Sequence, residues 1–208
     1  ILYDIPSEKI DTVSHDPLVQ LPQCLYQLEN RQLWVGTQNH GLIEIDLATK
    51  KLRAYGEAEG LPHLNVKSIT PDPSKQLWIG TSGGGLALCT MQNFRQFDRG
   101  DGLAFNRIYS VFNSDKNELW LATGNMIQKM DEFGFTSYHL DSLTHGAKCK
   151  TITTDERQRI WVGTEGKGIV VLNDDVTKLI DHRDGLPDNY IQKIAVNNEG
   201  KIYAATFT

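Results

Sequence analysis

The pentapeptide Leu33-Trp34-Val35-Gly36-Thr37 decides the fold, because four further copies of it follow at nearly constant spacing. The copies are Leu77-Trp78-Ile79-Gly80-Thr81, Leu119-Trp120-Leu121-Ala122-Thr123, Ile160-Trp161-Val162-Gly163-Thr164 and Ile202-Tyr203-Ala204-Ala205-Thr206. Successive aromatic residues of this anchor are 44, 42, 41 and 42 positions apart, and all four tryptophans of the chain occupy this one position. A period of this length predicts a repeat protein in which each repeat is one supersecondary unit.

Each repeat carries the signals of four short strands. An apolar residue lies nine positions before each anchor aromatic, and a polar turn such as Asp72-Pro73-Ser74-Lys75 separates the two. A glycine-rich turn such as Gly83-Gly84-Gly85 follows the anchor threonine, and two more apolar segments come after it, as at 169–172 and 176–180. Short apolar runs joined by such turns form antiparallel hairpins, and four strands in about 42 residues make one propeller blade. The sequence therefore predicts an all-β fold, a β-propeller of four-stranded antiparallel blades.

The aromatic residue of the anchor and the small residue two positions later point to the same face of their strand. In the first repeat these residues are Trp34 and Gly36, and in the third they are Trp120 and Ala122. A large ring beside a missing side chain lets neighbouring blades interdigitate without leaving a void. We therefore expect the tryptophans to act as wedges between blades rather than as surfaces on which a ligand stacks.

Composition excludes several classes of function. Of the 208 residues, 39% are hydrophobic and 23% are charged, which is typical of a soluble globular protein. The net charge of −5 argues against a nucleic-acid partner, because such a partner requires a basic surface. No run approaches the ~18 apolar residues needed to cross a bilayer. We expect no membrane contact by this segment itself, and no cofactor.

Metal and redox sites find no support in the sequence either. Cys24, Cys89 and Cys149 are far apart and show no Cys-x-x-Cys spacing, so we expect free thiols that pack as small core residues. None of the six histidines has a partner at zinc-binding spacing. We therefore expect no metal site.

One complete repeat resembles a known family. Glu59-Gly60-Leu61-Pro62 is followed by Val66-Lys67-Ser68-Ile69, then by the anchor at 77–81 and by Gly84-Gly85-Leu86. This combination is similar to the two-component regulator propeller repeat, and the copy with Asp184-Gly185-Leu186-Pro187 agrees with it. The resemblance covers almost the whole chain.

Two copies depart from this pattern in the loop before the first strand. Gly102-Leu103-Ala104 lacks the proline, and Ser142-Leu143-Thr144 lacks both the glycine and the proline. Because these two residue types control the backbone of a turn, we expect both inter-blade loops to be shaped differently from the others.

The resemblance implies a function as well as a fold. Such repeats form the extracytoplasmic sensor region of bacterial membrane receptors, including hybrid histidine kinases and some diguanylate cyclases, and in several gut bacteria the ligands are polysaccharide fragments. By this resemblance the chain is a non-catalytic, periplasmic propeller that senses a small molecule or an oligosaccharide. Its other partners would be further propeller blades or protomers of the parent receptor, including a homodimer.

The repeat count places both chain ends inside blades. Ile1 to Asp4 aligns with Ile43 to Asp46 in a third strand, and the last strand ends near Thr206, a second strand. One domain spanning 1–208 would thus hold about five repeats, as four full and two half blades. The halves could pair and close a five-bladed ring. Members of the resembled family usually have more blades, so we favour a segment of a larger propeller.

Propellers also host enzymes, and a lyase or a lactonase is the first alternative function. The positions that follow the apolar residue of each first strand are expected to line the central channel, and they include no carboxylate or histidine: Tyr26, Thr70, Phe112, Thr153 and Ala195. Asp72 and Asp155 head the turns between first and second strands, and we expect them to cap those turns. No catalytic residue is therefore assigned. A protein–protein interaction scaffold is the second alternative.

The loops at one end of the propeller are the best candidates for a binding surface. The loops that enter each first strand share a face with the turns between second and third strands, and the blades hold both rigidly. Their amide, cationic and aromatic groups suit the hydroxyl and C–H groups of a sugar. The candidate ligand-binding residues are His40, His63, Asn65, Asn106, Arg107, Asn125, Lys148, Glu165, Asp188, Asn189 and Tyr190.

Overall fold

The computed structural model describes residues 2–4, 9–11, 14, 16–28, 31–90, 93–173, 176–197 and 199–207, and confirms an all-β propeller architecture. Blade 1 contains β3 (Pro22–Leu28), β4 (Gln32–Thr37), β5 (Leu42–Asp46) and β6 (Leu52–Tyr55). Blade 2 contains β7 (Val66–Pro71), β8 (Leu77–Thr81), β9 (Leu86–Cys89) and β10 (Phe94–Phe97). Blade 3 contains β11 (Ile108–Asn113), β12 (Leu119–Thr123), β13 (Met126–Asp131) and β14 (Gly134–His139). Blade 4 contains β15 (Cys149–Thr154), β16 (Ile160–Thr164), β17 (Ile169–Asn173) and β18 (Val176–Ile180).

Two short hairpins accompany these blades. β1 (Leu2–Asp4) pairs with β2 (Lys9–Asp11), and β19 (Ile191–Val196) pairs with β20 (Ile202–Thr206), all strand pairs being antiparallel. The two hairpins form separate sheets, so in the described part of the chain β20 does not pair with β1 to close a ring. Ile1 of the expected first half blade lies outside the described residues.

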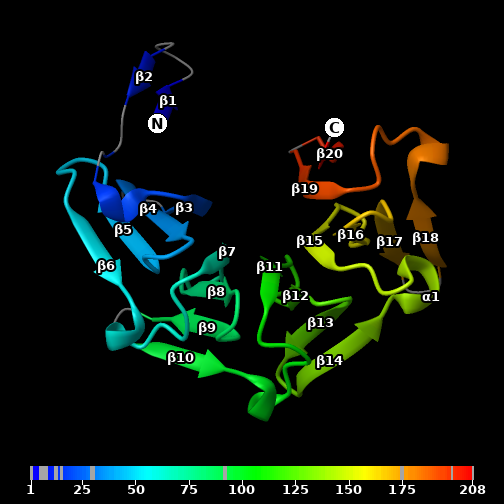
Figure 1. Cartoon of the computed structure of the whole chain (residues 1–208), viewed down its shortest axis with the longest axis horizontal. Helices are drawn as coiled ribbons and strands as arrows, with labels where there is room; N and C mark the ends of the chain where they lie inside the picture. The colour runs from blue at the N-terminus through cyan, green and yellow to red at the C-terminus, as the bar shows by residue number, and fades with distance from the viewer. Residues whose placement is uncertain are drawn as a thin grey trace.

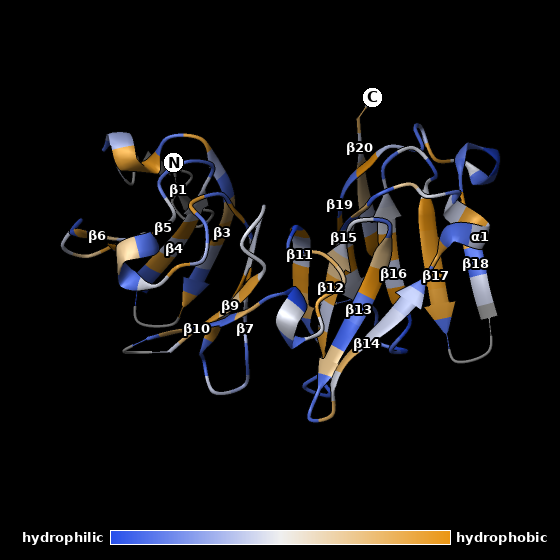
Figure 2. Ribbon diagram, turned by 60° about the horizontal axis from the view of Figure 1, so that its bottom comes forward, coloured by the Kyte–Doolittle hydropathy of each residue, from blue (hydrophilic) through white to orange (hydrophobic). Residues whose placement is uncertain are grey.

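The blades stand side by side in an open arc, with the first strand of each blade on the inner side (Figure 1). Going round the arc, β3 contacts β7, β7 contacts β11, β11 contacts β15, and β15 contacts β19. Middle strands such as β17 are mostly hydrophobic, whereas the outer strands β14 and β18 carry more hydrophilic residues (Figure 2). This gradient follows from position, because a middle strand is covered on both faces and an outer strand is partly in water.

Most core clusters of the described residues lie at the joints between blades, and one lies within blade 1. The joints confirm the expected role of the anchor. A Cβ atom added to Gly80 in β8 would lie 2.7 Å from Ile108 Cγ2 in β11, and one added to Gly163 would lie 2.6 Å from Ile191 Cγ2. Each tryptophan packs in one of these joint clusters, as Trp34 does with Val66. The missing side chain admits the next blade, and the ring fills the space beside it.

The joint between blades 3 and 4 uses a different pair of residues. Ala122 stands where blades 1, 2 and 4 have glycine, and Cys149 stands where β7, β11 and β19 have valine or isoleucine. Both side chains are fully buried in one cluster. A smaller partner in β15 therefore makes room for the extra methyl group in β12. Burial raises the pKa of the Cys149 thiol to about 12, as it does for Cys24, which confirms free cysteines that behave as core residues.

The faces of the arc on either side of its opening are uncovered. Leu25 of β3 is 63% exposed, although its counterparts Val111, Ile152 and Ile194 are at most 5% exposed. On the other side, Tyr203 in the anchor of β20 is 55% exposed, whereas Trp34 is 7% exposed. The residues that would form a joint are thus present on both faces without a neighbouring blade.

The anchor threonine closes the turn between second and third strands. Thr81 Oγ1 donates to the Gly85 carbonyl at 2.8 Å and accepts from Gly84 N at 3.1 Å, and Thr37 and Thr164 make the same pair of bonds in their own turns. Thr123 instead donates to backbone carbonyls of the preceding loop, because its turn to β13 has only two residues.

The loops between blades begin with a short capped helical turn. 3₁₀ helices span Pro17–Val19, Glu57–Glu59, Arg99–Asp101 and His182–Asp184, and the last three end at a glycine with φ near +100°. The expectation of a different shape is therefore wrong for Gly102-Leu103-Ala104. Ala104 stands in place of the proline and has an N–H group that proline lacks. The Gln128 side chain accepts a hydrogen bond from this group at 2.9 Å and so compensates for the missing proline. The expectation is confirmed for 142–144, where α1 (Asp141–Thr144) takes the place of the 3₁₀ turn.

Candidate ligand-binding site at the channel mouth

The entry loops and the turns between second and third strands meet at one end of the arc, as expected. The backbone hydrogen bond from Gly85 N to the Asn106 carbonyl, 2.8 Å long, joins such a turn to the next loop. Gly168 N bonds the Asn189 carbonyl at 2.8 Å in the same way, and Cys149 N bonds the Gly124 carbonyl. We call this end the mouth, because the first strands begin here.

Every first strand has an irregular register near its start. In β7, Val66 pairs with Thr81 and Ser68 pairs with Gly80, so that the residue between them has no cross-strand partner. Such a bulge re-aims the side chain of the extra residue. The bulge residues of the five first strands, which we call the axial residues, are Gln23, Lys67, Tyr109, Lys150 and Gln192.

Contacts between neighbouring first strands place the axial side chains toward the axis. Lys67 Nζ donates to Gln23 Oε1 at 2.9 Å, and Lys150 Nζ lies 4.8 Å from the centre of the Tyr109 ring. The pKa of Lys67 is lowered by burial and then by repulsion from Lys150 and Arg107. The bulges of β7 and β15, which lie on either side of β11, turn both lysines out of their sheets toward the middle of the arc.

A second polar group lies on the rim beside these residues. Glu165 accepts hydrogen bonds from Lys148 Nζ at 2.9 Å and from the Tyr190 hydroxyl at 2.8 Å. These two bonds lower the pKa of the Glu165 carboxyl, and Lys150 adds to the effect at longer range. Three of the predicted residues, Lys148, Glu165 and Tyr190, therefore come together and adjoin the axial group.

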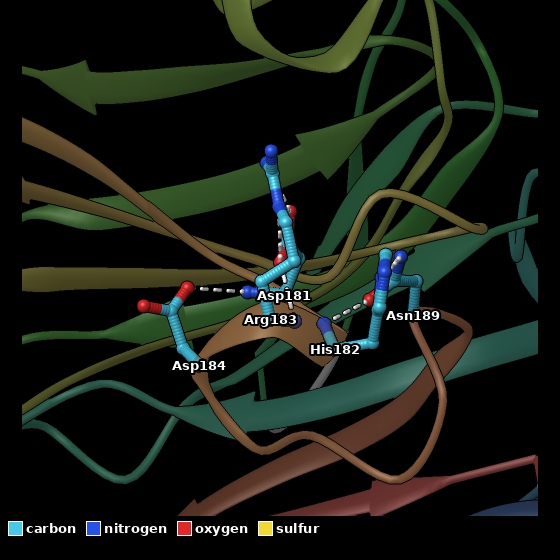
Figure 3. A network of polar contacts seen from close by, with 5 residues as sticks. All are labelled: Asp181, His182, Arg183, Asp184 and Asn189. Carbon is cyan, nitrogen blue, oxygen red and sulfur yellow. Dashed lines mark hydrogen bonds and ion pairs between the residues drawn. The ribbon is translucent and has the colours of Figure 1, made fainter.

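Other predicted residues lie in the same loops but support the backbone. Asn106 Oδ1 accepts from Arg99 N at 3.1 Å, and Asn189 Oδ1 accepts from His182 N at 2.8 Å. Figure 3 shows Asn189 and His182 within the polar network of the 3₁₀ turn. Both asparagines thus hold the helical turn that precedes their first strand, and a role in ligand contact stays a prediction.

In the same loops, Asp188 accepts from Tyr190 N at 2.8 Å, and Asn125 Nδ2 donates to Asp141 Oδ1 at 2.9 Å. These bonds order the loops on which the rim group lies. Ligand contact by either residue also stays a prediction.

His40, His63 and Asn65 form a separate group at the joint of blades 1 and 2. The His63 ring lies over Gly83, and His63 Nδ1 accepts from Asn65 N at 3.0 Å. Asn65 Oδ1 and His40 Nδ1 are buried and have no hydrogen-bond partner among the described residues. Unmet buried polar atoms of this kind are suited to water or a ligand.

The expected lining of the channel was wrong. Tyr26 packs in the joint cluster with Trp34, and Phe112 packs in the cluster with Trp120, so these positions lie between blades. The bulge is the reason, because it shifts which residues leave the plane of the sheet. The turn-capping role of the two aspartates is confirmed: Asp72 Oδ1 accepts from Gln76 N and Asp155 Oδ1 from Arg159 N.

The axial residues were missed, although the sequence contains a signal for them. Ile108 and Val111 both lie against Gly80, yet residues three apart point to opposite faces of a regular strand. The same odd spacing separates Val66 from Ile69, and Ile191 from Ile194. An odd apolar spacing that recurs in each repeat indicates a bulge, and the residue after the first apolar position is the one that it re-aims.

A second concave region lies between blades 3 and 4, away from the predicted residues. It has a volume of about 390 Å³, and its lining includes Glu118, Trp120, Lys129, Tyr138 and Gln158. Lys129 lies 3.3 Å from both Glu118 and Asp131, so the charges are paired within the protein. Within the described residues, no group of three or more His, Cys, Asp or Glu side chains could hold a metal ion.

The arc of four-stranded blades and its polar mouth define the class of the protein: it is a β-propeller repeat protein. The model of the two component regulator propeller family matches residues 60–83, which include the entry loop, β7 and the anchor of blade 2. This match covers one repeat of the chain, which is similar to the family there. No curated protein sequence matches the chain at a significant level.

Several solved structures share the fold. The extracellular domain of BT3049 from B. thetaiotaomicron, assigned as a hybrid two component system, is 26% identical, with a TM-score of 0.77 over 88% of this chain and 26% of that one. The extracellular domain of BT4673 from the same organism is 22% identical, with a TM-score of 0.72 over 86% and 25%. Virginiamycin B lyase from Staphylococcus aureus is 15% identical, with a TM-score of 0.67 over 94% and 72%, which shows the fold alone.

This chain spans about a quarter of the length of the two extracellular domains that it resembles. Those domains lie outside the cell membrane by their own descriptions. Among the helices that the structure describes, none has the length and apolar character needed to span a membrane.

Proposed function

We propose that this chain is a non-catalytic, ligand-binding part of the sensor propeller of a bacterial two-component-type receptor. The observation that carries the proposal is the convergence of the axial residues and the rim group at one mouth. Rigid strands hold these side chains, while the loops around them supply further polar groups. The family and the 26% identity to an extracellular domain of a two-component system support a sensor rather than an isolated enzyme.

The chemistry of the mouth also favours binding over catalysis. A general base needs a carboxylate or imidazole with a pKa near the working pH. The pKa of Glu165 is instead lowered by Lys148 and Tyr190, and Asp155 at the opposite end of β15 is engaged by Arg159 and Trp161. Such carboxylates are poor proton acceptors but good fixed points for orienting a ligand.

We further infer a periplasmic location and two kinds of partner. Tyr109 and Tyr190 offer aromatic faces beside amide and cationic groups, a combination that suits an oligosaccharide. The uncovered faces at Leu25 and Tyr203 suit further blades of the parent receptor, because each presents the residues that the internal joints bury. We also propose a homodimer, in which the outer strands form the contact between protomers.

A thermal-shift screen of the 208-residue chain against a panel of oligosaccharides tests the proposal. A ligand at 100 times its Kd should stabilise the folded chain by about 2.7 kcal/mol. Tyr190→Ala should remove the shift, and Lys178→Gln on the outer strand β18 should keep it. If no member of the panel shifts the transition, or if only divalent metal ions do, ligand sensing by this mouth is wrong.

A further inference from the structure

The mouth carries an excess of positive charge at its centre. Lys67 and Lys150 extend toward the axis from β7 and β15, and Arg107 immediately precedes β11, which lies between these strands. Repulsion from Lys150 and Arg107 reaches Lys67, which is half-buried. Three cations thus come from adjacent positions at the mouth ends of β7, β11 and β15, in a chain whose net charge is −5.

Within the part of the chain that the structure describes, no carboxylate forms an ion pair with Lys67 or Lys150. Lys67 contacts the Gln23 amide oxygen and Lys150 contacts the Tyr109 ring, and both of these groups are uncharged. Glu165 is nearby, but Lys148 and Tyr190 already occupy its two oxygens. In contrast, Lys129 and Arg159 elsewhere in the molecule each contact a carboxylate of the chain. The axial cations therefore differ from the paired charges of the blades.

Like charges held together cost free energy unless a counter-charge binds between them. The β-bulges fix the backbone at Lys67 and Lys150, since they are part of the strand pairing. Ammonium and guanidinium groups bind carboxylate, sulfate and phosphate groups through charge-assisted hydrogen bonds. The Tyr109 ring beside Lys150 adds an apolar surface for the part of the ligand that carries the anion.

We propose that the mouth binds an anionic group of the ligand, a carboxylate, sulfate or phosphate, between Lys67, Lys150 and Arg107. The inference rests on the proposed ligand-binding function and adds the class of ligand. Glu165 on the rim then orients the hydroxyl groups of the ligand, while the axial lysines select its charge.

The test compares charged and neutral probes on the folded chain at constant ionic strength. Isothermal titration uses sodium sulfate, inorganic phosphate, trigalacturonic acid and, as the neutral probe, maltotriose. Each is titrated into the wild type, the Lys67→Gln/Lys150→Gln variant and the control Lys178→Gln, after circular dichroism has shown that all three are folded. Sulfate and phosphate report an ion alone, whereas trigalacturonic acid reports an anion carried by a sugar.

We expect the anionic probes to bind the wild type and Lys178→Gln. Their affinity for the double variant should be lower by a factor of at least about ten for each of the two lysines removed. Binding should also weaken as salt is raised. Equal affinity of an anionic probe for the wild type and the double variant would overturn the inference, and so would a lack of binding by all three anionic probes.

The two proposals can fail separately. Binding of maltotriose or another neutral glycan, without binding of any anionic probe, contradicts the anion site but leaves ligand sensing intact. Lysine-dependent binding of sulfate, with no response to any organic ligand, supports the anion site and contradicts the sensing function.

Discussion

The joints between blades and the mouth of the channel use the same first strands but different residues of them. At the joints, Val66 and Ile108 fit against a glycine of the preceding blade, and a single extra carbon atom has no room. At the mouth, the bulge residues of the same strands leave the sheet, and Lys67 contacts an uncharged amide there rather than a carboxylate. The joint residues are constrained by packing between blades. The bulge residue of each first strand is free of this constraint, because it points out of the sheet. Changes at the joints should therefore lower stability, whereas changes at the mouth should affect binding.

The largest effect is expected for Gly80→Val. Its Cβ atom would lie 2.7 Å from Ile108 Cγ2, so blades 2 and 3 must separate, at a cost of about 3 kcal/mol. Urea denaturation followed by circular dichroism measures the loss. Gly56→Ala is the control, because its backbone is extended and its new Cβ would make ordinary contacts of 3.5 Å. Equal stability of Gly80→Val and the wild type would show that the joint is not tightly packed.

The joint of blades 3 and 4 tests whether the anchor and the next strand are matched. Cys149→Ile should cost about 2 kcal/mol because the larger side chain meets the Ala122 methyl group. Adding Ala122→Gly gives this joint the same glycine–isoleucine pair that Gly80 and Ile108 form between blades 2 and 3. The second change should therefore restore most of the lost stability. A double-mutant cycle on chemical denaturation measures the coupling. Additive effects of the two changes would contradict the match.

Gln128 shows how a joint supports the loops of the mouth. It is buried, accepts from Ala104 N and donates to the Gly102 carbonyl at 3.1 Å. Gln128→Leu leaves both groups without a partner and should cost about 2 kcal/mol. Ala104→Pro should recover part of this loss in the variant, because proline has no N–H group, and should bring no gain to the wild type. A stabilising effect of the proline in both backgrounds would contradict this account of the loop.

The smallest effect on stability is expected at the mouth itself. Lys67→Gln/Lys150→Gln removes two cations that repel each other, so the free energy of unfolding should stay the same or rise slightly, within about 0.5 kcal/mol. Thermal unfolding measures the change as an equal or slightly higher midpoint. Lys129→Gln is the opposite case, because its ammonium group bridges Glu118 and Asp131, and it should lower the midpoint. A large loss in the axial double variant would mean that the lysines hold the blades together.

Much of the fold could be predicted because it repeats. The tryptophan anchor, the glycine two residues later and the turn-closing threonine each perform one physical task in nearly every blade. Loops that break the repeat were harder to predict. Gln128 lies 24 residues from Ala104 in the sequence, so no local pattern connects it with the proline that it replaces.

The candidate site was only partly predictable for a related reason. Blade geometry predicted the loops at the mouth and named Lys148, Glu165 and Tyr190 as separate candidates, and the structure brings these three side chains together. Their contact with a ligand stays a prediction. Asn106 and Asn189 belong to the same loops, but hydrogen bonds to their own 3₁₀ turns occupy their side chains. Position in a loop cannot separate a side chain that faces a ligand from one that holds the loop.

The sequence by itself determined the blade: its length, its four strands and the wedge that joins it to the next blade. These follow from spacing and side-chain size, which a repeated pattern displays directly. The tertiary structure alone decided the chemistry of the mouth. Lys67 and Lys150 are 83 residues apart and lie on strands that are separated by β11. Only the curvature of the arc and the bulge in each strand turn both side chains toward the axis.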